Sequence, residues 1–438
     1  MTPATDEADV TATPVDNCDV FVVGGGPAGA AVAILLAEGG LDVVMAERER
    51  HPRFHVGESL LPHSLPILER FGVIDQVREI GQLKPGAEFV SQDGATNPVF
   101  WFDNALTDGP DHAYQVRRAD FDKILFDRAR DLGVRCYEGT TATVKVCDDT
   151  AVTIATETDD GGKARYDAGL LVDASGRSTI TARMWNDRHV DRRHNVAAIF
   201  GHFSGVPRLG GRRAGNIRIH LTNPGWMWQI PLTDGVTSVG MVTSGERIAG
   251  RKGSIESFFH QHVAGNPEVA RLLSDAEPIG QMRTTGNFSY SASRVVGPGF
   301  VRVGDAYGFI DPIFSTGVHL AFLAAEEAAH AILTARREPK RRNQLFAAYE
   351  RSVQRRARYI SWFIYSFDDP AFRELLLNPR NVLGVERAII SLLAGDFRQD
   401  LRLTSRIQLF KAIRWLMQRK ERGSLRRVPA WPTTSNRT

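Results

Sequence analysis

The sequence predicts an α/β protein whose first part is a nucleotide-binding fold of the Rossmann type. Three observations predict it: an apolar run from Val20 to Val23, a glycine-rich turn after it, and a second apolar run from Leu41 to Ala46 that ends on Glu47. The residues between the turn and the second run, Ala30 to Ala37, suit a buried helix. Strand, turn, helix, strand and acid in this order favour an adenine dinucleotide site over a purely structural turn.

Each glycine of this turn has its own predicted role. Gly24 permits the tight turn, the missing side chain of Gly26 lets a pyrophosphate approach the backbone, and Gly29 lets helix and strand pack closely. The helix start, at Ala28, offers unpaired N–H groups and the positive end of the helix dipole to the phosphates. Glu47 follows Gly29 by 18 residues, a spacing that suits a carboxylate bonded to the ribose hydroxyls.

Length and composition limit the remaining possibilities. At 438 residues the chain is long enough for two or three interleaved domains. Lys plus Arg number 54 and Asp plus Glu 51, a balance without the basic excess of a nucleic-acid-binding protein. Cys18, Cys136 and Cys147 form neither a disulfide framework nor a metal-ligand spacing. No run reaches the roughly 18 apolar residues of a membrane span. We therefore expect a soluble, cytoplasmic protein, with residues 1–17 as a disordered lead.

Several polar residues outside the turn have two possible interpretations. Ser59 and Glu58 follow a glycine bend closely enough to bond a cofactor, but they equally suit a helix cap. His51, His55 and Glu58 have no recognised ligand spacing, so no metal is expected. Lys84 precedes a Pro-Gly turn, where a lysine is usually a solvated charge. A catalytic role for it therefore needs support beyond its local sequence.

Three further positions suit contacts to a long nucleotide. Arg117 or Arg118 stands at the start of a predicted helix, where it can meet a phosphate or a flavin edge. Asp173 ends a buried run, 170–172, that delivers a turn beside the cradle. Asp305 follows another predicted strand and can accept a hydrogen bond from a sugar hydroxyl.

Two more stretches carry specific expectations. A helix is predicted from Gly317 to about Leu333, and its first turn, with Ser315 and Thr316 as exposed donors, suits an anion. Trp226 and Trp228 lie two residues apart on one face of a predicted strand, and the periodicity alone favours a place in the core.

The C-terminal part of the sequence is predicted to be helical. The expected helices are 342–366, 371–376, 380–395 and about 404–420. The last is amphipathic and basic, and we expect it to pack on the body with a charged outer face. Contact with a membrane or with an acidic carrier protein is the alternative. Residues 92–113 are expected to form a long, partly ordered loop.

Four motifs together resemble the flavoprotein monooxygenase superfamily: GGGPAG with Glu47, VRRADFD, DASGR and GDAYGFIDP. The run Trp226–Pro231 is similar to the WxWxIP motif of flavin-dependent halogenases, and GESLLP at 57–62 and FIDPIFSTGVHLA at 309–321 resemble the same group. The resemblance extends to about residue 400. It implies a Rossmann-like FAD-binding domain interleaved with a β-sheet substrate domain, followed by a helical C-terminal region.

The expected boundaries follow from this resemblance. They are a lead at 1–17, an FAD-binding domain at 18–80, 115–180 and 295–335, a substrate sheet at 81–114 and 181–294, C-terminal helices at 336–421 and a tail at 422–438. The predicted FAD contacts are Gly24, Gly26, Ala28, Gly29, Glu47, Arg48, Ser59, Arg118, Asp173, Asp305 and Gly317.

The resemblance also implies a mechanism. A separate flavin reductase supplies FADH2, oxygen gives a flavin hydroperoxide, and a halide attacks it to form hypohalous acid. Lys84 matches the lysine that holds or carries the oxidised halogen across a tunnel to the substrate. Thr316 and Gly317 match the halide site. Trp226 and Trp228 match the tryptophans that keep substrate away from the flavin.

One departure bears on the substrate. Tryptophan halogenases carry a Glu just before the Ser-Thr-Gly triplet, and Phe314 stands there in this chain. The chain is therefore more similar to halogenases of pyrroles and phenols, which act on free substrates or on groups tethered to a carrier protein. We expect a chlorinase of secondary-metabolite (antibiotic) biosynthesis. The alternatives are an NAD(P)H-dependent aromatic hydroxylase or a flavin reductase of the same fold, and a flavin-binding scaffold without chemistry.

Overall fold

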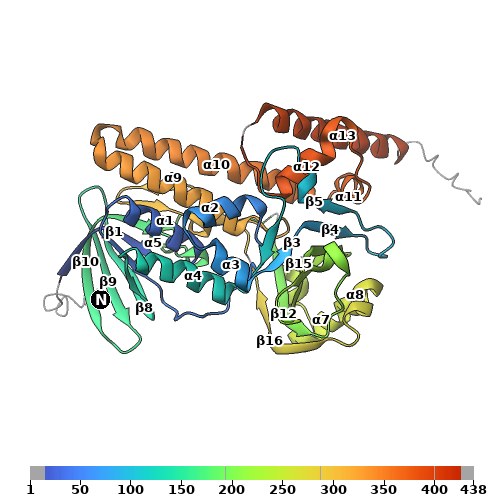
Figure 1. The fold of residues 1–438 in the computed structure, drawn as a ribbon, viewed down its shortest axis with the longest axis horizontal. Coiled ribbons are helices and arrows are strands. Elements are labelled where there is room, and N and C mark those ends of the chain that lie inside the picture. Colours follow the sequence, from blue (N-terminus) through green and yellow to red (C-terminus); the bar gives the residue numbers. More distant parts are fainter. Residues whose placement is uncertain (1–14, 193, 287, 399, 426–438) are drawn as a thin grey trace, which may run out of the picture.

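The computed structural model describes residues 15–425, apart from 193, 287 and 399 (Figure 1). A large sheet lies at the left of Figure 1 and a second one at the lower right. Helices α9 (Gly317–Arg337) and α10 (Arg342–Ser366) run along the top, and the last helices lie at the upper right.

The first sheet has eight strands and a parallel centre. Its order is β18 (Val296–Gly297), β19 (Phe300–Arg302), β10 (Lys163–Asp173), β1 (Val15–Val23), β2 (Val43–Ala46) and β7 (Arg135–Tyr137); β9 (Val152–Thr158) also pairs with β10, and β8 (Thr140–Cys147) pairs with β9. Strand β1 pairs in parallel with β2 and β10, so that Val23 lies opposite Ala46 and Asp173. The carboxyl ends of these strands therefore meet at one edge, where ligands bind in open parallel sheets.

Three helices cover one face of this sheet. They are α1 (Pro27–Glu38), α4 (Arg118–Asp131) and α9. Their apolar side chains form one core with those of β1 and β2, and that core includes Phe121, Phe126 and Phe322. Because α1 is apolar on every side, it is buried between the sheet, α4 and α9.

The second sheet has seven strands. Its order is β16 (Glu277–Thr285), β12 (Val196–Ser204), β15 (Thr237–Ser244), β14 (Trp226–Pro231), β13 (Ile217–Leu221), β4 (Gly86–Val90) and β5 (Val99–Trp101). All neighbours are antiparallel except β13 and β4. Side chains alternate along β14, so Met227 packs with α6 (Gly245–Ala249), α7 (Ile255–Ala264) and α8 (Pro267–Leu272), while the tryptophans face the C-terminal helices.

Smaller elements connect the two sheets. Strand β3 (Gln82–Lys84) pairs with β6 (Ala113–Gln115), and β11 (Arg188–Val190), β17 (Tyr290–Ala292) and β20 (Gly308–Phe309) form a three-stranded sheet. Helices α2 (Leu65–Arg70) and α3 (Ile74–Ile80) precede β3, and α5 (Ile180–Met184) follows β10.

The C-terminal helices are α10, α11 (Pro370–Leu377), α12 (Val385–Leu393) and α13 (Leu401–Leu425), close to the predicted ranges. The third begins five residues later than predicted, because Leu383 and Gly384 have positive φ and interrupt the helix. No helix among the described residues is long and apolar enough to cross a bilayer.

The structure corrects three sequence expectations. Residues 15–17 belong to β1 and pair with β10, so the predicted lead of 1–17 is too long; residues 1–14 lie outside the described part. Helix α13 extends to Leu425, into the predicted tail, whose residues 426–438 also lie outside it. The predicted loop 92–113 contains β5, because Phe100 packs edge-on against Phe89 of β4 and is buried there.

Candidate active site

The glycine turn has the geometry that the sequence predicts for a nucleotide cradle. Gly24 has φ +105°, and a Cβ there would lie 2.4 Å from the carbonyl oxygen of Ala174. A Cβ on Gly29 would lie 1.8 Å from the carbonyl oxygen of Gly24, so helix and strand require glycine at that position. A Cβ on Gly26 would contact the end of the Arg53 side chain, with Nη2 at 3.5 Å, and no backbone atom from another segment of the described chain. Helix α1 has no side-chain cap, and its first N–H groups are available to an anion.

Glu47 is fixed at the end of β2, beside this turn. Its Oε2 accepts a hydrogen bond from the N–H of Gly25 at 2.8 Å, and its Oε1 accepts one from the N–H of Glu49 at 3.0 Å. Arg53 Nη2 lies 3.5 Å from Oε2. The carboxylate is therefore held in the position from which it can bond a ribose.

Arg53 and Arg118 meet at one buried carboxylate. Asp122 Oδ2 accepts from Arg53 at 2.9 Å, and both oxygens of Asp122 accept from Arg118, at 2.7 and 3.0 Å. Burial opposes the charge of Asp122, but the two guanidinium groups outweigh it and lower its pKa. Sequence analysis missed Arg53, since its partners lie in other segments of the chain.

Two of the predicted cofactor residues, Asp305 and Asp173, lie beside the cradle. Burial raises the pKa of Asp305 to about 6, against the opposing charges of Arg118 and Arg177. Asp173 accepts four hydrogen bonds from Ser175 and Thr181, so it shapes the turn and has neither oxygen free for a direct contact. Any contribution of Asp173 to FAD binding is therefore expected to act through the shape of this turn.

Two smaller observations complete this edge. The exposed guanidinium of Arg48 donates to Ser178 Oγ at 3.1 Å. A Cβ on Gly304, which has φ +62°, would lie 3.0 Å from Ala28 Cβ, so the loop that carries Asp305 approaches the start of α1 closely.

Lys84 is buried at the end of β3, with 1% of its surface exposed. Its Nζ donates hydrogen bonds to Ser59 Oγ and to the carbonyl oxygen of Leu60, both at 2.8 Å. The Phe102 ring centroid lies 5.4 Å from Nζ. The local interpretation of Lys84 as a solvated surface charge is therefore wrong, because Phe102 and the 59–60 segment close over it.

Burial alone lowers the pKa of Lys84 from 10.5 to about 7. No carboxylate of the described residues lies within ion-pair distance of Nζ. An ammonium has three N–H donors, and the two bonds to Ser59 and Leu60 occupy two of them. One position remains, for a proton to donate or for the lone pair of the neutral amine.

Residues 56–64 connect three predicted parts of the site, which are the cradle, Lys84 and the first turn of α9. The carbonyl oxygens of Val56 and Gly57 accept from Arg118 at the cradle, and Ser59 and Leu60 hold Lys84. Ser64 Oγ lies 3.2 Å from Nδ1 of His319 in the first turn of α9. Neither Glu58 nor Ser59 caps a helix, so that interpretation is wrong.

The Glu58 carboxylate contacts a residue that the sequence did not single out. His202 Nε2 of β12 lies 2.5 Å from Glu58 Oε1, and both side chains are largely buried. Next to it, the ring of Phe54 stacks on Phe200 at 6.2 Å. These contacts join the 51–59 segment to the second sheet, and they span too much of the chain for a local pattern to show them.

The start of α9 borders a cavity of about 630 Å³. Asp305, Thr316 and Gly317 line one side of it, and Ile360 and Ile364 of α10 line the other. Thr316 is buried, so the expectation that it is exposed was wrong. Helix α9 has no side-chain cap, and its first N–H groups lie beside the cavity. This arrangement suits a small anion.

Trp226 and Trp228 are buried, as the periodicity predicts. Their ring centroids lie 5.8 Å apart, and Trp228 Nε1 donates to Ser238 Oγ at 3.1 Å. Phe314 and the Phe102 that covers Lys84 belong to the same apolar cluster. The pair therefore lies in core that is continuous with the lysine site.

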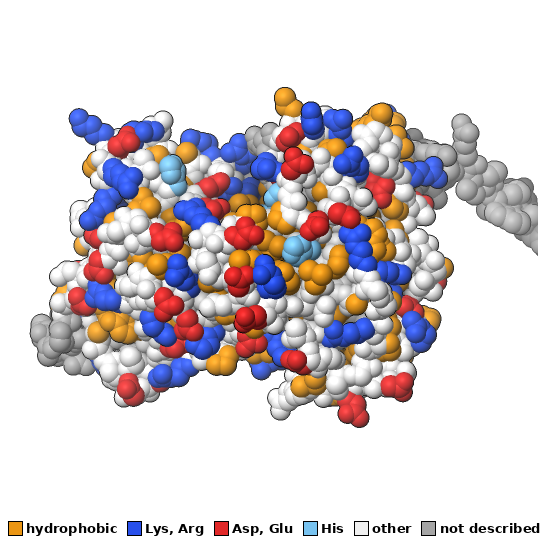
Figure 2. All heavy atoms as spheres, viewed as in Figure 1, with side chains coloured by type: hydrophobic (Ala, Val, Ile, Leu, Met, Phe, Trp, Pro, Cys, Tyr) orange, Lys and Arg blue, Asp and Glu red, His pale blue; other side chains and the backbone are white. Residues whose placement is uncertain are grey.

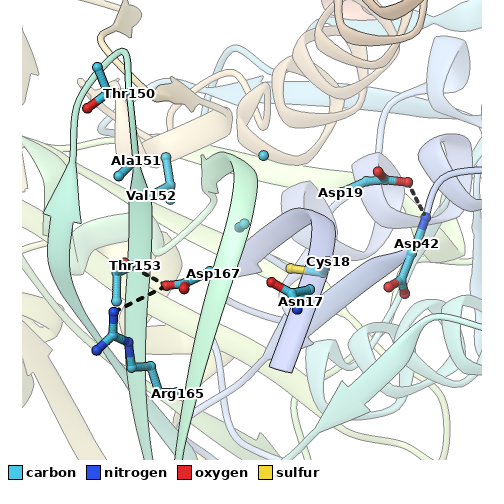
Figure 3. A pocket seen from close by; sticks show the side chains of 12 residues that line it. Asn17, Cys18, Asp19, Asp42, Thr150, Ala151, Val152, Thr153, Arg165 and Asp167 are labelled. Atoms are coloured by element: carbon cyan, nitrogen blue, oxygen red, sulfur yellow. Dashed lines mark hydrogen bonds and ion pairs between the residues drawn. The ribbon is translucent and has the colours of Figure 1, made fainter. Parts of the chain in front are cut away.

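A second hollow, of about 660 Å³, lies at the other end of the first sheet (Figure 3). Asn17, Cys18 and Asp19 line it at the amino end of β1, and across it Thr153 and Arg165 contact Asp167. Because cofactors bind at the carboxyl ends of parallel strands, this hollow is separate from the cradle.

The fold and the cradle define a flavoprotein of the FAD-binding Rossmann type with a second, antiparallel sheet. The chain matches the family described as Tryptophan halogenase over residues 19–104 and 101–372. It is 30% identical over 416 residues to the 1H-pyrrole-2-carbonyl-(peptidyl-carrier protein) chlorinase of Pseudomonas fluorescens, covering 88% of this chain and 90% of the relative.

Solved structures agree with this assignment. The myxobacterial chondrochloren halogenase, an FAD-dependent halogenase, is 30% identical with a TM-score of 0.77, covering 88% of this chain and 91% of that one. A flavoprotein/dehydrogenase from Cytophaga hutchinsonii is 27% identical with a TM-score of 0.84, covering 93% and 100%. The chain belongs to the tryptophan halogenase family and is an enzyme of the flavin-dependent halogenase type.

Proposed function

We propose that this halogenase uses FADH2 and O2 to chlorinate an electron-rich aromatic, a pyrrole or a phenol, in secondary-metabolite biosynthesis. The substrate is free or tethered to a carrier protein, and a separate flavin reductase supplies the reduced cofactor. The observation that carries the proposal is the buried amine of Lys84, which has one unused position and a pKa lowered to about 7.

The cradle fits FAD. Gly26 and the uncapped start of α1 would hold the pyrophosphate, Glu47 would bond the adenosine ribose, and Asp305 would bond the ribityl chain. Reduced FAD, when bound, supplies the electrons with which oxygen becomes an oxidant of halide. Asp305 contributes a carboxyl group whose pKa, about 6, leaves it largely ionised near neutral pH as an acceptor for hydroxyls.

The halide is proposed to lie at the first turn of α9. Thr316 and Gly317 present backbone N–H groups there, and the cavity beside them has room for an anion. The neighbouring His319 is buried and its pKa is lowered to about 3, so it adds no positive charge. In the first turn of α9 the backbone N–H groups, and not His319, would therefore bind the anion.

Lys84 handles the oxidised halogen. The unused position of its ammonium donates a hydrogen bond to the oxygen of hypochlorous acid, which makes chlorine more electrophilic. When the aromatic carbon takes the chlorine, the O–Cl bond breaks with its electrons on oxygen. That oxygen receives the ammonium proton and leaves as water. The ring carbon then loses its own proton, which restores both the aromatic ring and, through solvent, the ammonium.

The substrate class follows from Phe314. No carboxylate stands at this position, and the phenyl ring packs against Phe367 with centroids 6.1 Å apart. A pyrrole nitrogen or a phenol oxygen stabilises the cationic ring by its own lone pair, so such substrates need a weaker base. The carrier-bound pyrrole named for the Pseudomonas relative fits this requirement.

One experiment separates the candidate functions. Purified protein is given FAD, chloride and a panel of pyrroles and phenols, with or without a flavin reductase and NADPH. We expect products with the chlorine isotope pattern when reductase, NADPH and chloride are all present. A hydroxylase would consume NADPH without the reductase and give oxygenated products. A scaffold would bind flavin and give no product. Either result would overturn the proposal.

A further inference from the structure

The most exposed apolar side chains of the described residues gather in one region. Leu401 is 87% exposed, Leu383 74%, Leu416 59% and Val382 52%, and no other large apolar side chain described in residues 15–425 exceeds half exposure. All four belong to the last helical layer. Figure 2 shows apolar and basic side chains side by side on the upper right, where Figure 1 places α13.

This region is also basic. Between Leu401 and Lys420 the sequence has six cationic residues and no acidic one. No carboxylate of the described residues forms an ion pair with Arg402 or Arg406, and the guanidinium of Arg406 bonds only to the Arg402 carbonyl and Ser405 Oγ. Arg402 is exposed and Arg406 is partly exposed, so both guanidinium groups are accessible to an acidic partner.

The same region lies directly behind the cover of Lys84. The segment after Phe102 runs under α12, where Leu106 donates from its N–H to the carbonyl of Arg387 at 3.1 Å. A Cβ on Gly384 would lie 3.9 Å from Leu106 Cδ1 on one side and 3.9 Å from Arg406 Nε on the other. The turn at Gly384 therefore lies between Arg406 and the segment 102–106, whose first residue, Phe102, covers Lys84.

We propose that Val382, Leu383, Leu401, Arg402 and Arg406, the C-terminal face, dock an acidic carrier domain that presents the aromatic substrate as a thioester on its flexible arm. This inference rests on the proposed function, because it specifies how the substrate of the same site arrives. The leucines act as apolar anchors, and the arginines steer a negatively charged domain and fix its orientation.

A membrane surface fits this face less well. The apolar side of α13, with Leu403, Ile407 and Phe410, is already buried in the protein core. On the first turns of α13, where Leu401 lies, Thr404, Ser405 and Gln408 are exposed, so the anchors of this face are not part of an apolar stripe that could insert among lipid chains; the exposed Trp415 and Leu416 lie further along the helix. Isolated anchors beside cations match a protein partner better.

The test compares one acyl group in two forms. Pyrrole-2-carbonyl is offered on an acidic peptidyl carrier domain and, separately, as the N-acetylcysteamine thioester, to the wild type and to the double variant Arg402→Glu, Arg406→Glu. We expect kcat/KM for the carrier form to fall about tenfold or more in the variant, with the small thioester unchanged. Leu383→Ser is expected to act in the same direction.

A matched control reverses the same charge elsewhere. Lys145 of β8 and Lys252 after α6 are exposed and have no ion pair with the described residues. The variant Lys145→Glu, Lys252→Glu is expected to chlorinate the carrier form at the wild-type rate. An equal loss in control and test variants would overturn the inference, because it would reflect net charge alone.

The other outcomes are equally decisive. If wild type uses the small thioester as well as the carrier form, or uses only free phenols, the docking inference fails and the proposed function stands. If no substrate is chlorinated in any form, the proposed function itself fails. If the wild type sediments with phosphatidylserine vesicles and the double variant does not, the C-terminal face binds a membrane and the docking inference fails. Loss of a wild-type dimer in the double variant would assign it to a second copy of the chain.

Discussion

Replacement of Lys84 by methionine measures how much the burial of the amine destabilises the fold, independently of its proposed role in chlorination. The pKa of Lys84 falls from 10.5 to about 7 on folding. At about 1.4 kcal/mol per unit, this shift costs ~5 kcal/mol of stability while both states hold the proton. Methionine has a similar volume and removes this cost. It also leaves the buried Leu60 carbonyl without a donor, a loss of about 1 to 3 kcal/mol. We expect Lys84→Met to be about 2 to 4 kcal/mol more stable than wild type near pH 7.

The pH dependence gives the sign of the effect. Below about pH 7 folded and unfolded chains both carry the ammonium, and the full cost applies. Between about pH 7 and 10.5 the unfolded chain binds the extra proton, so wild-type stability rises relative to the variant by about 1.4 kcal/mol per pH unit. Above that range neither state is charged and the cost disappears.

The measurement is urea unfolding of both proteins across this pH range. All other groups are common to the two chains, so the difference between their unfolding free energies isolates Lys84. We expect the higher stability of Lys84→Met to vanish at about pH 9. If the difference in unfolding free energy stays constant with pH, the pKa of Lys84 is not lowered. If the variant is less stable at every pH, the buried amine does not destabilise the wild type.

Three further predictions concern single side chains. Ser59→Ala removes one of the two acceptors at the amine of Lys84, and we expect chlorination to fall about tenfold with flavin retention unchanged, as read from product yield and flavin absorbance. Gly29→Ala places a Cβ against backbone and should abolish FAD retention on gel filtration, whereas Gly26→Ala should retain the fold by circular dichroism and lose affinity. Trp228→Phe loses one buried hydrogen bond and should lower stability by about 0.5 to 1.5 kcal/mol in urea unfolding. Full FAD retention in the first glycine variant would contradict the packing argument.

The cofactor cradle could be predicted because its determinants are local. Gly24, Gly29 and Glu47 lie within one strand, turn, helix and strand, and each requirement is set by its neighbours in sequence. The burial of the two tryptophans also followed from periodicity. The helix ranges in the C-terminal region were close for the same reason.

The environment of Lys84 could not be predicted. Its burial depends on Phe102 and on the pairing of β3 with β6, which brings Ser59 and Leu60 to the amine. The contact of Glu58 with His202 joins residues 144 positions apart. A local pattern contains no information on contacts of this kind, and the role predicted for Lys84 came from the resemblance to known halogenases instead.

The most direct test of the account compares wild type and Lys84→Met under turnover. Both receive a flavin reductase, NADPH, FAD, chloride, oxygen and the preferred aromatic, with taurine added in parallel samples to capture hypochlorous acid. We predict that the variant still forms chlorinated taurine and gives no chlorinated aromatic, because the oxidant is made without the lysine and its delivery is lost. A variant that chlorinates the aromatic at the wild-type rate would contradict the account.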